Sequence, residues 1–510
     1  MGDDGGHPPP LFSDATLGSD VRAIFGDAGY RDRDIRDHLG ANEEISLLAL
    51  GRPVLEERIG KVGGPLGVLL GLFLLCRGTP LGNAETALGA EAIRALTASG
   101  LVKSTAGRLT PTVQLYTVEE LIIAADLLER HAAKARDFVL GPFGVTLKLA
   151  SFAFRRPVGS VLDLGCGSGT LAALAASHAD RVVATDVNPR AVAFSRFNAE
   201  LNGLDDFECR EGSLFEPVSR ERFDLILCNP PYVISPSETY VYRDGGTELC
   251  RQIVREAPDH LTEGGYLQMM VEWPERIDQD WRSEVSQWLD EGRCDAWLLR
   301  LYSYPAQQYA QIWLRQEYGE VAPPTEAVSS WTDHLAGLGV HSVGGGLLVL
   351  RRAGAEAPIR TIREAPRISP GPVGDAIGRW ISSQSLLSSI MDRAELLDTR
   401  LVPAPGLERV ERTTPTGEGW TTRSRELRIQ TGLRFGANVD PVAEEIVGLL
   451  DGERTPREAL ELFAGRHGIG VEPFLDGLTK ALAKLLELGL LVQGDSQIRP
   501  VSEAPTGAVG

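Results

Sequence analysis

Lysine is scarce in this chain, which has six Lys among its 51 basic residues. Acidic residues number 70, so the formal net charge is -19 and the isoelectric point lies near 5.0. This balance argues against a surface that broadly coats nucleic acid or an anionic membrane, although a local basic groove stays compatible with it. The preference for arginine over lysine reflects a GC-rich genome more than a function.

The cysteines form no Cys-x-x-Cys pair, the spacing that marks common zinc and redox sites. Several of them stand in apolar runs, so we expect buried, reduced thiols rather than a disulfide framework. We therefore expect no metal site. The six cysteines are Cys76, Cys166, Cys209, Cys228, Cys250 and Cys294.

Membrane signals are also missing. Met1–Pro10 lacks the basic start and apolar stretch of a signal peptide. The most apolar run, Leu66–Cys76, is too short to cross a bilayer and favours a core helix. We expect a cytoplasmic protein that has no membrane partner.

At 510 residues the chain is long enough for two to four domains. The pattern predicts an α/β fold class, with a Rossmann-like seven-stranded sheet flanked by winged-helix-like α+β modules at both ends. The expected parts are a disordered tail 1–17, a helical and winged-helix-like domain 18–116, a connecting helix 117–137, the sheet domain 138–352, a linker 353–374, a C-terminal domain 375–497 that begins irregularly and ends in winged-helix-like helices, and a disordered tail 498–510.

The N-terminal module is expected to end in a helix over Asn83–Ser99 and strands over 101–104 and 109–115, the layout of a winged helix. A DNA-reading helix would expose arginines, whereas this one presents Glu85 and Glu91. We therefore favour a protein-contacting or substrate-selecting module over a DNA reader.

Several helix starts are marked by capping residues. Thr117 with Glu120 resembles a capping box and predicts the connecting helix, which would run to about Asp137. A proline at the first helical position marks three starts in the C-terminal domain. These starts are Asp440-Pro441, Thr455-Pro456 and Glu472-Pro473.

Residues 138–352 alternate buried apolar runs with helical patterns, which predicts a doubly wound sheet. Two of the strands, near Leu298 and Leu348, should pair as an antiparallel edge. The seven predicted strands are Ser160–Leu164, Arg181–Thr185, Phe207–Arg210, Phe223–Cys228, Gly265–Val271, Ala296–Tyr302 and Gly346–Arg351.

A glycine-rich turn follows the first of these strands. Gly165, Gly167 and Gly169 alternate, and their missing side chains allow a ligand to approach the backbone closely. The spacing differs from the Gly-x-Gly-x-x-Gly of a dinucleotide site, which cradles a pyrophosphate. It suits a nucleoside ligand without phosphate.

Two acidic residues lie next to this turn and at the end of the next strand, where each could bind a polar group of such a ligand. Asp163, just before the glycines, suits an ammonium group, and Asp186 ends the next strand, where an acid suits the ribose hydroxyls. Ser213 and Leu214 follow the third strand and are expected near the adenine, although a plain turn role stays open for them.

Asn229-Pro230-Pro231-Tyr232 follows the fourth strand. Adjacent prolines restrict the backbone, so the loop is preset. The Asn229 side-chain oxygen and the Pro230 carbonyl would accept the two hydrogens of a planar amine or amide, and Tyr232 would stack on it. The loop therefore indicates a catalytic site that acts on a planar nitrogen.

With these motifs, residues from about Phe138 to Trp273 resemble class I S-adenosylmethionine-dependent methyltransferases of the Asn-Pro-Pro-Tyr amino-methylating group. Within it they are most similar to the protein-glutamine methyltransferases that modify release factors, also at Asp244–Leu249 and Glu263–Tyr266. The resemblance implies S-adenosyl-L-methionine as co-substrate and catalysis at Asn229, Pro230, Pro231 and Tyr232. The predicted cofactor contacts are Asp163, Gly165, Cys166, Gly167, Gly169, Asp186, Val187, Ser213, Leu214 and Asn229.

The methyl acceptor stays open at this point. Ser213 stands where the family often has Asp, and Leu140–Thr146 replaces the family's segment ahead of the glycine loop. A glutamine-type amide in a protein is the leading acceptor, because the chain is acidic. An exocyclic base amine in RNA or DNA, a small-molecule amine, and a non-catalytic scaffold are the alternatives.

Overall fold

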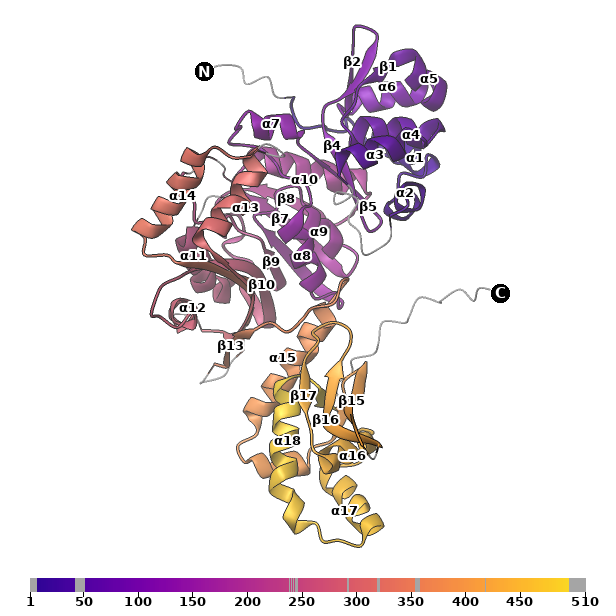
Figure 1. Cartoon of the computed structure of the whole chain (residues 1–510). Coiled ribbons are helices and arrows are strands. Elements are labelled where there is room, and N and C mark those ends of the chain that lie inside the picture. The colour runs from indigo at the N-terminus through magenta and orange to yellow at the C-terminus, as the bar shows by residue number, and fades with distance from the viewer. Residues whose placement is uncertain are drawn as a thin grey trace, which may run out of the picture. The chain divides into compact units, whose positions relative to one another are not determined.

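A mixed eight-stranded sheet lies at the centre of the first of two units, Met1–Glu364 and Ala365–Gly510, into which the computed structural model divides (Figure 1). The strand order is β13-β11-β12-β10-β9-β6-β7-β8, and β10, β9, β6, β7 and β8 run parallel. The structure describes residues 7–41, 51–237, 239, 241, 243, 246–290, 293–318, 322–353, 358–417 and 419–494.

Each of the seven strands predicted for this sheet is present. Leu298 and Leu348, expected on the antiparallel pair, lie directly opposite each other in the register. The bounds are β6 Val158–Leu164, β7 Ala179–Asp186, β8 Phe207–Glu211, β9 Phe223–Cys228, β10 Leu261–Glu275, β11 Asp295–Pro305, β12 Ser342–Arg351 and β13 Arg360–Glu364.

The expected count of seven strands and the expected edge are both wrong, because β13 pairs in parallel with β11 and forms the edge. This strand lies inside the segment 353–374 that was expected to be a linker. Its residues Arg-Thr-Ile-Arg-Glu follow a stretch rich in alanine and proline, which hid a short edge strand. The boundary between the units falls just after it.

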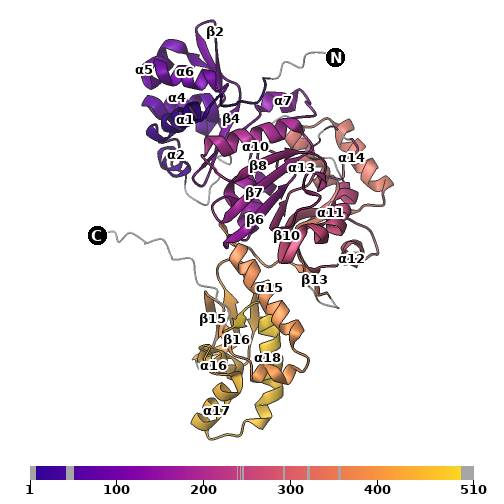
Figure 2. The same ribbon diagram turned by 180° about the vertical axis from the view of Figure 1, so that it is seen from behind.

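Helices cover the sheet on both sides, as the two opposite views show (Figure 1 and Figure 2). Helices α13 and α14 are inserted between β11 and β12 and pack against each other. The helices are α8 Gly144–Phe152, α9 Thr170–Ala175, α10 Pro189–Leu201, α11 Gly246–His260, α12 Arg282–Asp290, α13 Ala306–Tyr318 and α14 Thr325–Gly337.

The N-terminal part is helical and shares one apolar core with α10, including Phe25, Phe73 and Phe194. In its three-stranded sheet β1-β3-β2, strand β1 precedes helices α5 and α6 and strands β2 and β3 follow them, and the winged-helix interpretation stays a prediction. The elements are α1 Ala15–Asp27, α2 Asp32–Leu39, α3 Arg52–Ile59, α4 Gly64–Leu69, a π-helical turn Leu70–Leu74, β1 Thr79–Pro80, α5 Leu81–Leu88, α6 Ala90–Ala98, β2 Val102–Thr105 and β3 Arg108–Pro111.

The connecting helix predicted over 117–137 is wrong. A hairpin of β4, Gln114–Val118, and β5, Leu121–Ala125, lies there, followed by the short helix α7, Leu128–Ala132. Val118 pairs with Leu121 across a two-residue turn in which Glu119 has a φ of 55°. Branched residues on β5 favour a strand, and they outweigh the local resemblance of Thr117 and Glu120 to a capping box.

Two other N-terminal expectations need correction. The single helix over Asn83–Ser99 is broken into α5 and α6 at Gly89, whose φ of 83° no helix accommodates. The tail 1–17 is shorter than expected, because α1 already begins at Ala15, with the Asp14 side chain capping it.

In the second unit, helix starts at Asp440 and Thr455 are confirmed. Thr455 and Glu458 form a full capping box. Glu472-Pro473 instead begins a 3-10 turn before α18, and the expected tail 498–510 lies outside the described residues. The elements are α15 Gly374–Ser389, β14 Leu401–Pro403, β15 Leu407–Thr416, β16 Gly419–Ile429, β17 Gly436–Asn438, α16 Pro441–Leu449, α17 Pro456–His467, α18 Leu475–Glu487 and β18 Leu491–Gln493.

The sequence analysis did not predict the long hairpin of β15 and β16, because it expected the C-terminal domain to begin without regular structure. It pairs with β17 in a three-stranded sheet, while β14 and β18 form a separate two-stranded sheet. Whether this unit is winged-helix-like stays a prediction.

Candidate active site

A pocket lies where four neighbouring parallel strands, β6, β7, β8 and β9, reach their carboxyl ends. In sheets of this kind ligands bind at that edge. Segment 138–141, Thr146, Val241 and residues of α9, α10 and α11 also line it. The predicted site residues that line this pocket are Gly165, Cys166, Gly167, Asp186, Val187, Ser213, Leu214, Asn229, Pro230 and Pro231.

The glycine loop is held tightly to the end of β7. The carbonyl of Thr185 accepts hydrogen bonds from the backbone N–H groups of Gly165 and Cys166, both at 2.9 Å. Gly165 and Gly167 have positive φ values of 77° and 54°, and a side-chain Cβ built on either would meet no atom within 4 Å. Their backbone therefore has open space beside it, and contact with a nucleoside ligand stays a prediction.

Gly169 has a different role from the other two glycines. It does not line the pocket, and a Cβ there would lie 2.4 Å from the Ser195 hydroxyl on α10. The residue therefore allows the start of α9 to pack closely on α10.

Asp186 lies on the rim of the pocket with both oxygens in use. Its Oδ2 accepts from Gly167 N at 2.9 Å and its Oδ1 accepts from Asn188 N at 2.8 Å. Burial raises the pKa of this carboxyl above its usual range, and the backbone hydrogen bonds work against that rise. Each oxygen keeps a lone pair that could accept from a ribose hydroxyl.

Asp163 lies behind the glycine loop, outside the pocket lining, and is fully buried. Its Oδ2 accepts from Ala172 N at 2.9 Å in α9, and its Oδ1 has no hydrogen-bond partner in the described part of the chain. Burial raises the pKa of this carboxyl to about 7. A direct contact to a ligand ammonium group stays a prediction.

The Asn229 amide is oriented by a residue that sequence reasoning left without a role. Asn229 Nδ2 donates to Thr146 Oγ1 at 3.2 Å, across 83 residues of sequence. The Asn229 Oδ1 atom is shielded from solvent and has no partner among the described residues. An acceptor left unpaired at a pocket is costly, so the site is suited to a ligand that brings an N–H donor.

Pro230 and Pro231 line the pocket, whereas Tyr232 does not. Tyr232 is 4% exposed, and burial raises the pKa of its hydroxyl well above its usual range. Stacking of this ring on the acceptor therefore has no support from the pocket lining.

The wall segment 138–141 was also missed as part of the site. Buried Asp126 anchors it, because its Oδ2 accepts from Val139 N at 2.9 Å. Arg190, in the first turn of α10, forms an ion pair with Asp126. The ion pair joins two residues that are 64 positions apart in the sequence, so a local sequence pattern could not predict it.

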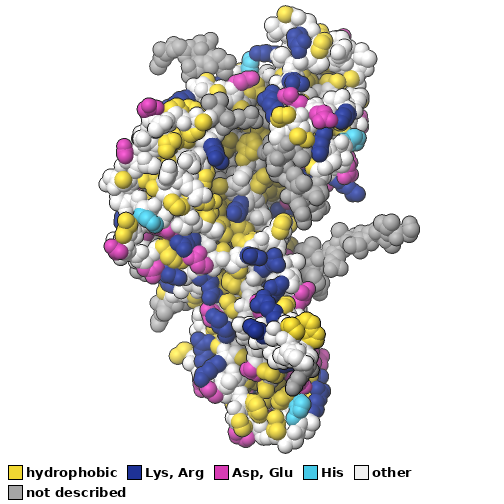
Figure 3. Space-filling model, in the orientation of Figure 1, with side chains coloured by type: hydrophobic (Ala, Val, Ile, Leu, Met, Phe, Trp, Pro, Cys, Tyr) yellow, Lys and Arg dark blue, Asp and Glu magenta, His cyan; other side chains and the backbone are white. Residues whose placement is uncertain are grey.

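Asp186 is the one charged side chain among the described residues that line the pocket. Figure 3 shows Lys and Arg side chains scattered over the visible face of the first unit, without a continuous basic patch. In the described ranges no group of three or more His, Cys, Asp or Glu is arranged to hold a metal ion. None of the described helices has the length and apolar character needed to cross a bilayer.

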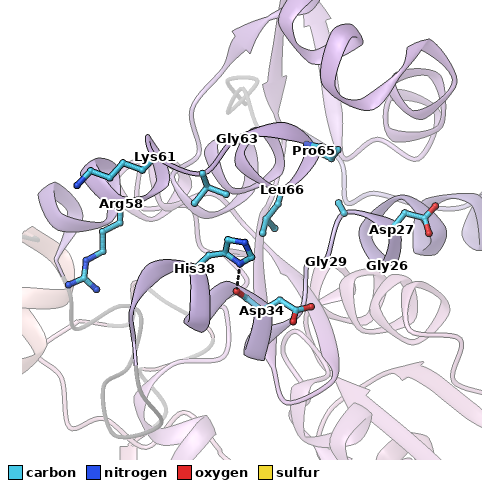
Figure 4. Close-up of a pocket in the computed structure, with 12 residues that line it drawn as sticks. Gly26, Asp27, Gly29, Asp34, His38, Arg58, Lys61, Gly63, Pro65 and Leu66 are labelled. Carbon is cyan, nitrogen blue, oxygen red and sulfur yellow. Dashed lines mark hydrogen bonds between the residues drawn. The ribbon is translucent and has the colours of Figure 1, made fainter.

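Another pocket lies in the N-terminal part, between α2, α3 and the start of α4, and holds none of the predicted residues (Figure 4). Asp34 and His38 lie on one side, where the His38 ring pairs with the Asp34 carbonyl, and Arg58 and Lys61 lie on the other. Arg58 donates to the carbonyls of Leu39 and Gly40, so its charge already has local partners.

Two segments match known families. Residues 144–284 match the family described as "Methyltransferase small domain". Residues 378–493, in the second unit, match "Domain of unknown function (DUF7782)".

Curated relatives match the same central region. The chain is 39% identical over 153 residues to a release factor glutamine methyltransferase of Geobacter sulfurreducens, covering 26% of this chain and 52% of that protein. It is 37% identical over 147 residues to a ribosomal protein uL3 glutamine methyltransferase of Bradyrhizobium diazoefficiens, covering 26% and 46%. A ribosomal RNA small subunit methyltransferase C of Salmonella arizonae is 35% identical over 130 residues, covering 24% and 34%.

The chain thus spans at most about half the length of these relatives. The family match to residues 144–284 agrees with the strand order, because the central sheet is a large mixed sheet of the Rossmann-like methyltransferase type. Residues 144–284 belong to the methyltransferase small domain family.

Proposed function

We propose that the chain is an S-adenosylmethionine-dependent methyltransferase that modifies a planar nitrogen, a glutamine-type amide of a protein. The observation that carries the proposal is Asn229, which lines the pocket, is held through Thr146, and has a buried Oδ1 without a hydrogen-bond partner among the described residues. An amide or exocyclic amine brings the N–H donor that this atom lacks.

The residues fit the co-substrate. The open backbone at Gly165 and Gly167 would receive the methionine part, and Asp186 would hold the ribose. When bound, S-adenosylmethionine supplies an electrophilic methyl group on its sulfonium. Asp163 stays behind the loop, where it caps the start of α9.

The chain's own part in the chemistry is orientation. Asn229 Oδ1 and the Pro230 carbonyl would each accept one hydrogen of the acceptor NH₂ group and turn its lone pair toward the methyl. The hydrogen bonds strengthen as positive charge develops on the nitrogen, which stabilises the transition state, and the methylated nitrogen then releases one of its two protons to solvent. Asn229 therefore acts in binding and in catalysis, while Thr146 keeps its amide in the productive orientation.

The pocket's charge supports a protein acceptor. A phosphate-bearing acceptor is usually met by Lys or Arg, and the described lining has neither. The exposed Val241 at the lining suits a peptide's apolar side chains. Two relatives named as glutamine methyltransferases point the same way.

A base amine in RNA is the second candidate, because relatives named as ribosomal RNA methyltransferases match the same region. One experiment separates the two. The full-length chain is incubated with tritiated S-adenosylmethionine and a cell extract, and the product is digested with protease or with nuclease. We expect protease alone to release the label; release by nuclease alone would establish the RNA alternative, and no labelling would contradict both.

A further inference from the structure

A buried carboxylate lies near the Asn229 loop without lining the pocket. Glu272, on β10, is 2% exposed, and its two oxygens accept from two tyrosine hydroxyls. Tyr302 donates to Oε1 at 2.8 Å and Tyr309 donates to Oε2 at 2.5 Å. Burying a carboxylate lowers stability unless the carboxylate is hydrogen-bonded. The two tyrosine hydroxyls provide these hydrogen bonds to Glu272.

Tyr309 reaches the loop itself. Its hydroxyl oxygen accepts from the backbone N–H of Ile234 at 3.1 Å, five residues after Asn229. A hydroxyl has a single proton, and here it goes to Glu272, which leaves the oxygen's lone pairs for Ile234. Glu272 therefore fixes the direction in which Tyr309 holds the loop.

Building on the proposed function, we propose that Tyr309 and Glu272 are positioning residues that hold the Asn229–Ile234 segment so that Asn229 Oδ1 faces the acceptor nitrogen. Thr146 holds the Asn229 side chain, and Tyr309 holds the backbone that follows it. Neither Tyr309 nor Glu272 touches the pocket, so they act through the loop. Small displacements of a catalytic group lower rates strongly, which is why such a brace matters.

Helix α13, which carries Tyr309, also holds the chain beyond Ile234. Val233 N donates to the carbonyl of Arg243, and the Arg243 guanidinium pairs with Glu317 of α13 at 2.8 Å. Arg243 also lies over the rings of Trp313 and Trp331, from α13 and α14. The inserted pair of helices thus supports both ends of the segment from 233 to 243.

A purely structural role is the rival explanation, and the chain offers a matched control. Tyr302 makes the same kind of bond to Glu272 as Tyr309, but in the described part of the chain it makes none to residues 229–234. Changing either tyrosine to Phe removes one donor from the same carboxylate. Only Tyr309→Phe also removes the acceptor of Ile234.

The test compares the full-length chain with Tyr309→Phe and Tyr302→Phe. Initial rates of tritium transfer from S-adenosylmethionine to extract protein are measured, together with cofactor affinity by calorimetry and hydrogen–deuterium exchange of residues 229–237. Tyr309→Phe should lower the rate at least about 10-fold, keep the cofactor Kd within about 2-fold and speed exchange at Ile234. Tyr302→Phe should stay within about 2-fold of the parent rate.

Equal rate losses in the two variants, or unchanged exchange at Ile234 in Tyr309→Phe, would overturn the positioning role. If the parent chain labels no extract component, the proposed function fails instead. The exchange measurement still decides in that case whether Tyr309 braces the loop.

Discussion

Asn198 donates a hydrogen bond from Nδ2 to the carbonyl of Ser168 in the glycine loop, at 2.8 Å. The same fully buried side chain pairs with the backbone of Ala124 on β5 in both directions, accepting from its N–H at 2.8 Å and donating to its carbonyl at 2.9 Å. One asparagine of α10 thus ties the N-terminal hairpin to the cofactor loop. One turn later, Asn202 pairs with Ile122 in the same way, but among the described residues it makes no hydrogen bond to the loop.

Asn198→Ala should therefore lower both stability and cofactor affinity, because it leaves buried backbone groups of Ala124 and Ser168 unpaired. We expect a loss of about 1–3 kcal/mol in the free energy of unfolding. Asn202→Ala is the matched control, expected to lower stability while leaving cofactor affinity within about 2-fold. Calorimetric titration and urea unfolding measure both, and equal affinities in the two variants would contradict a link through Ser168.

Asn229→Ala should abolish methyl transfer while leaving cofactor affinity nearly intact, because its free oxygen is proposed to hold the acceptor. Losing one such preorganised hydrogen bond lowers rates by about 10²–10³-fold. Thr146→Val keeps the shape of the side chain but removes the hydroxyl that accepts from Asn229 Nδ2, so a smaller loss of about 10-fold is expected. Wild-type turnover in Asn229→Ala would show that the loop is only structural.

Asp186→Ala should weaken S-adenosylmethionine binding by about 1.5–3 kcal/mol, since it removes the proposed ribose acceptor and the partner of Gly167 N. Asp186→Asn keeps one acceptor oxygen and should fall between the parent and the alanine variant. Calorimetry checks this order. An affinity that does not change in Asp186→Ala would remove Asp186 from the site.

Much of the central sheet was predictable because its strands are largely buried on both faces and contain apolar runs, such as Leu225–Cys228 in β9. The loop residues could be placed too, since the ends of parallel strands meet at one edge. The edge strand β13 and the β15–β16 hairpin are mostly exposed or half-buried, so they lack that signal.

What failed were elements decided by tertiary contacts. Thr117 and Glu120 mimic a helix start, yet β5 is held as a strand by hydrogen bonds to Asn198 and Asn202, some 80 residues away. The orientation of Asn229 likewise depends on Thr146, a residue that a single sequence gives no reason to choose. Tyr232 was expected to stack on the acceptor because of its place in the loop; its burial could not be foreseen from the motif alone, and the stacking stays a prediction.

The first unit should keep the cofactor site without the second. Each residue lining the pocket lies between Phe138 and Ile253, inside the unit Met1–Glu364. A chain ending after Glu364, which retains β13, should bind S-adenosylmethionine with a Kd within about 2-fold of the full chain. A large loss of affinity in a truncated chain that still shows a cooperative unfolding transition would mean that the second unit takes part in binding.

Asp163 should make stability fall as pH rises. Burial raises its pKa from 3.8 to about 7, so between these values the folded chain binds more protons than the unfolded one, and the contribution is lost as pH passes 7. Asp163→Asn removes the titration but keeps an acceptor for Ala172 N. The difference in free energy of unfolding, Asp163→Asn minus parent, should therefore increase by about 1–3 kcal/mol between pH 5 and pH 8. Urea unfolding at both pH values measures the difference; a constant offset would show that Asp163 is already ionised in the fold at pH 5.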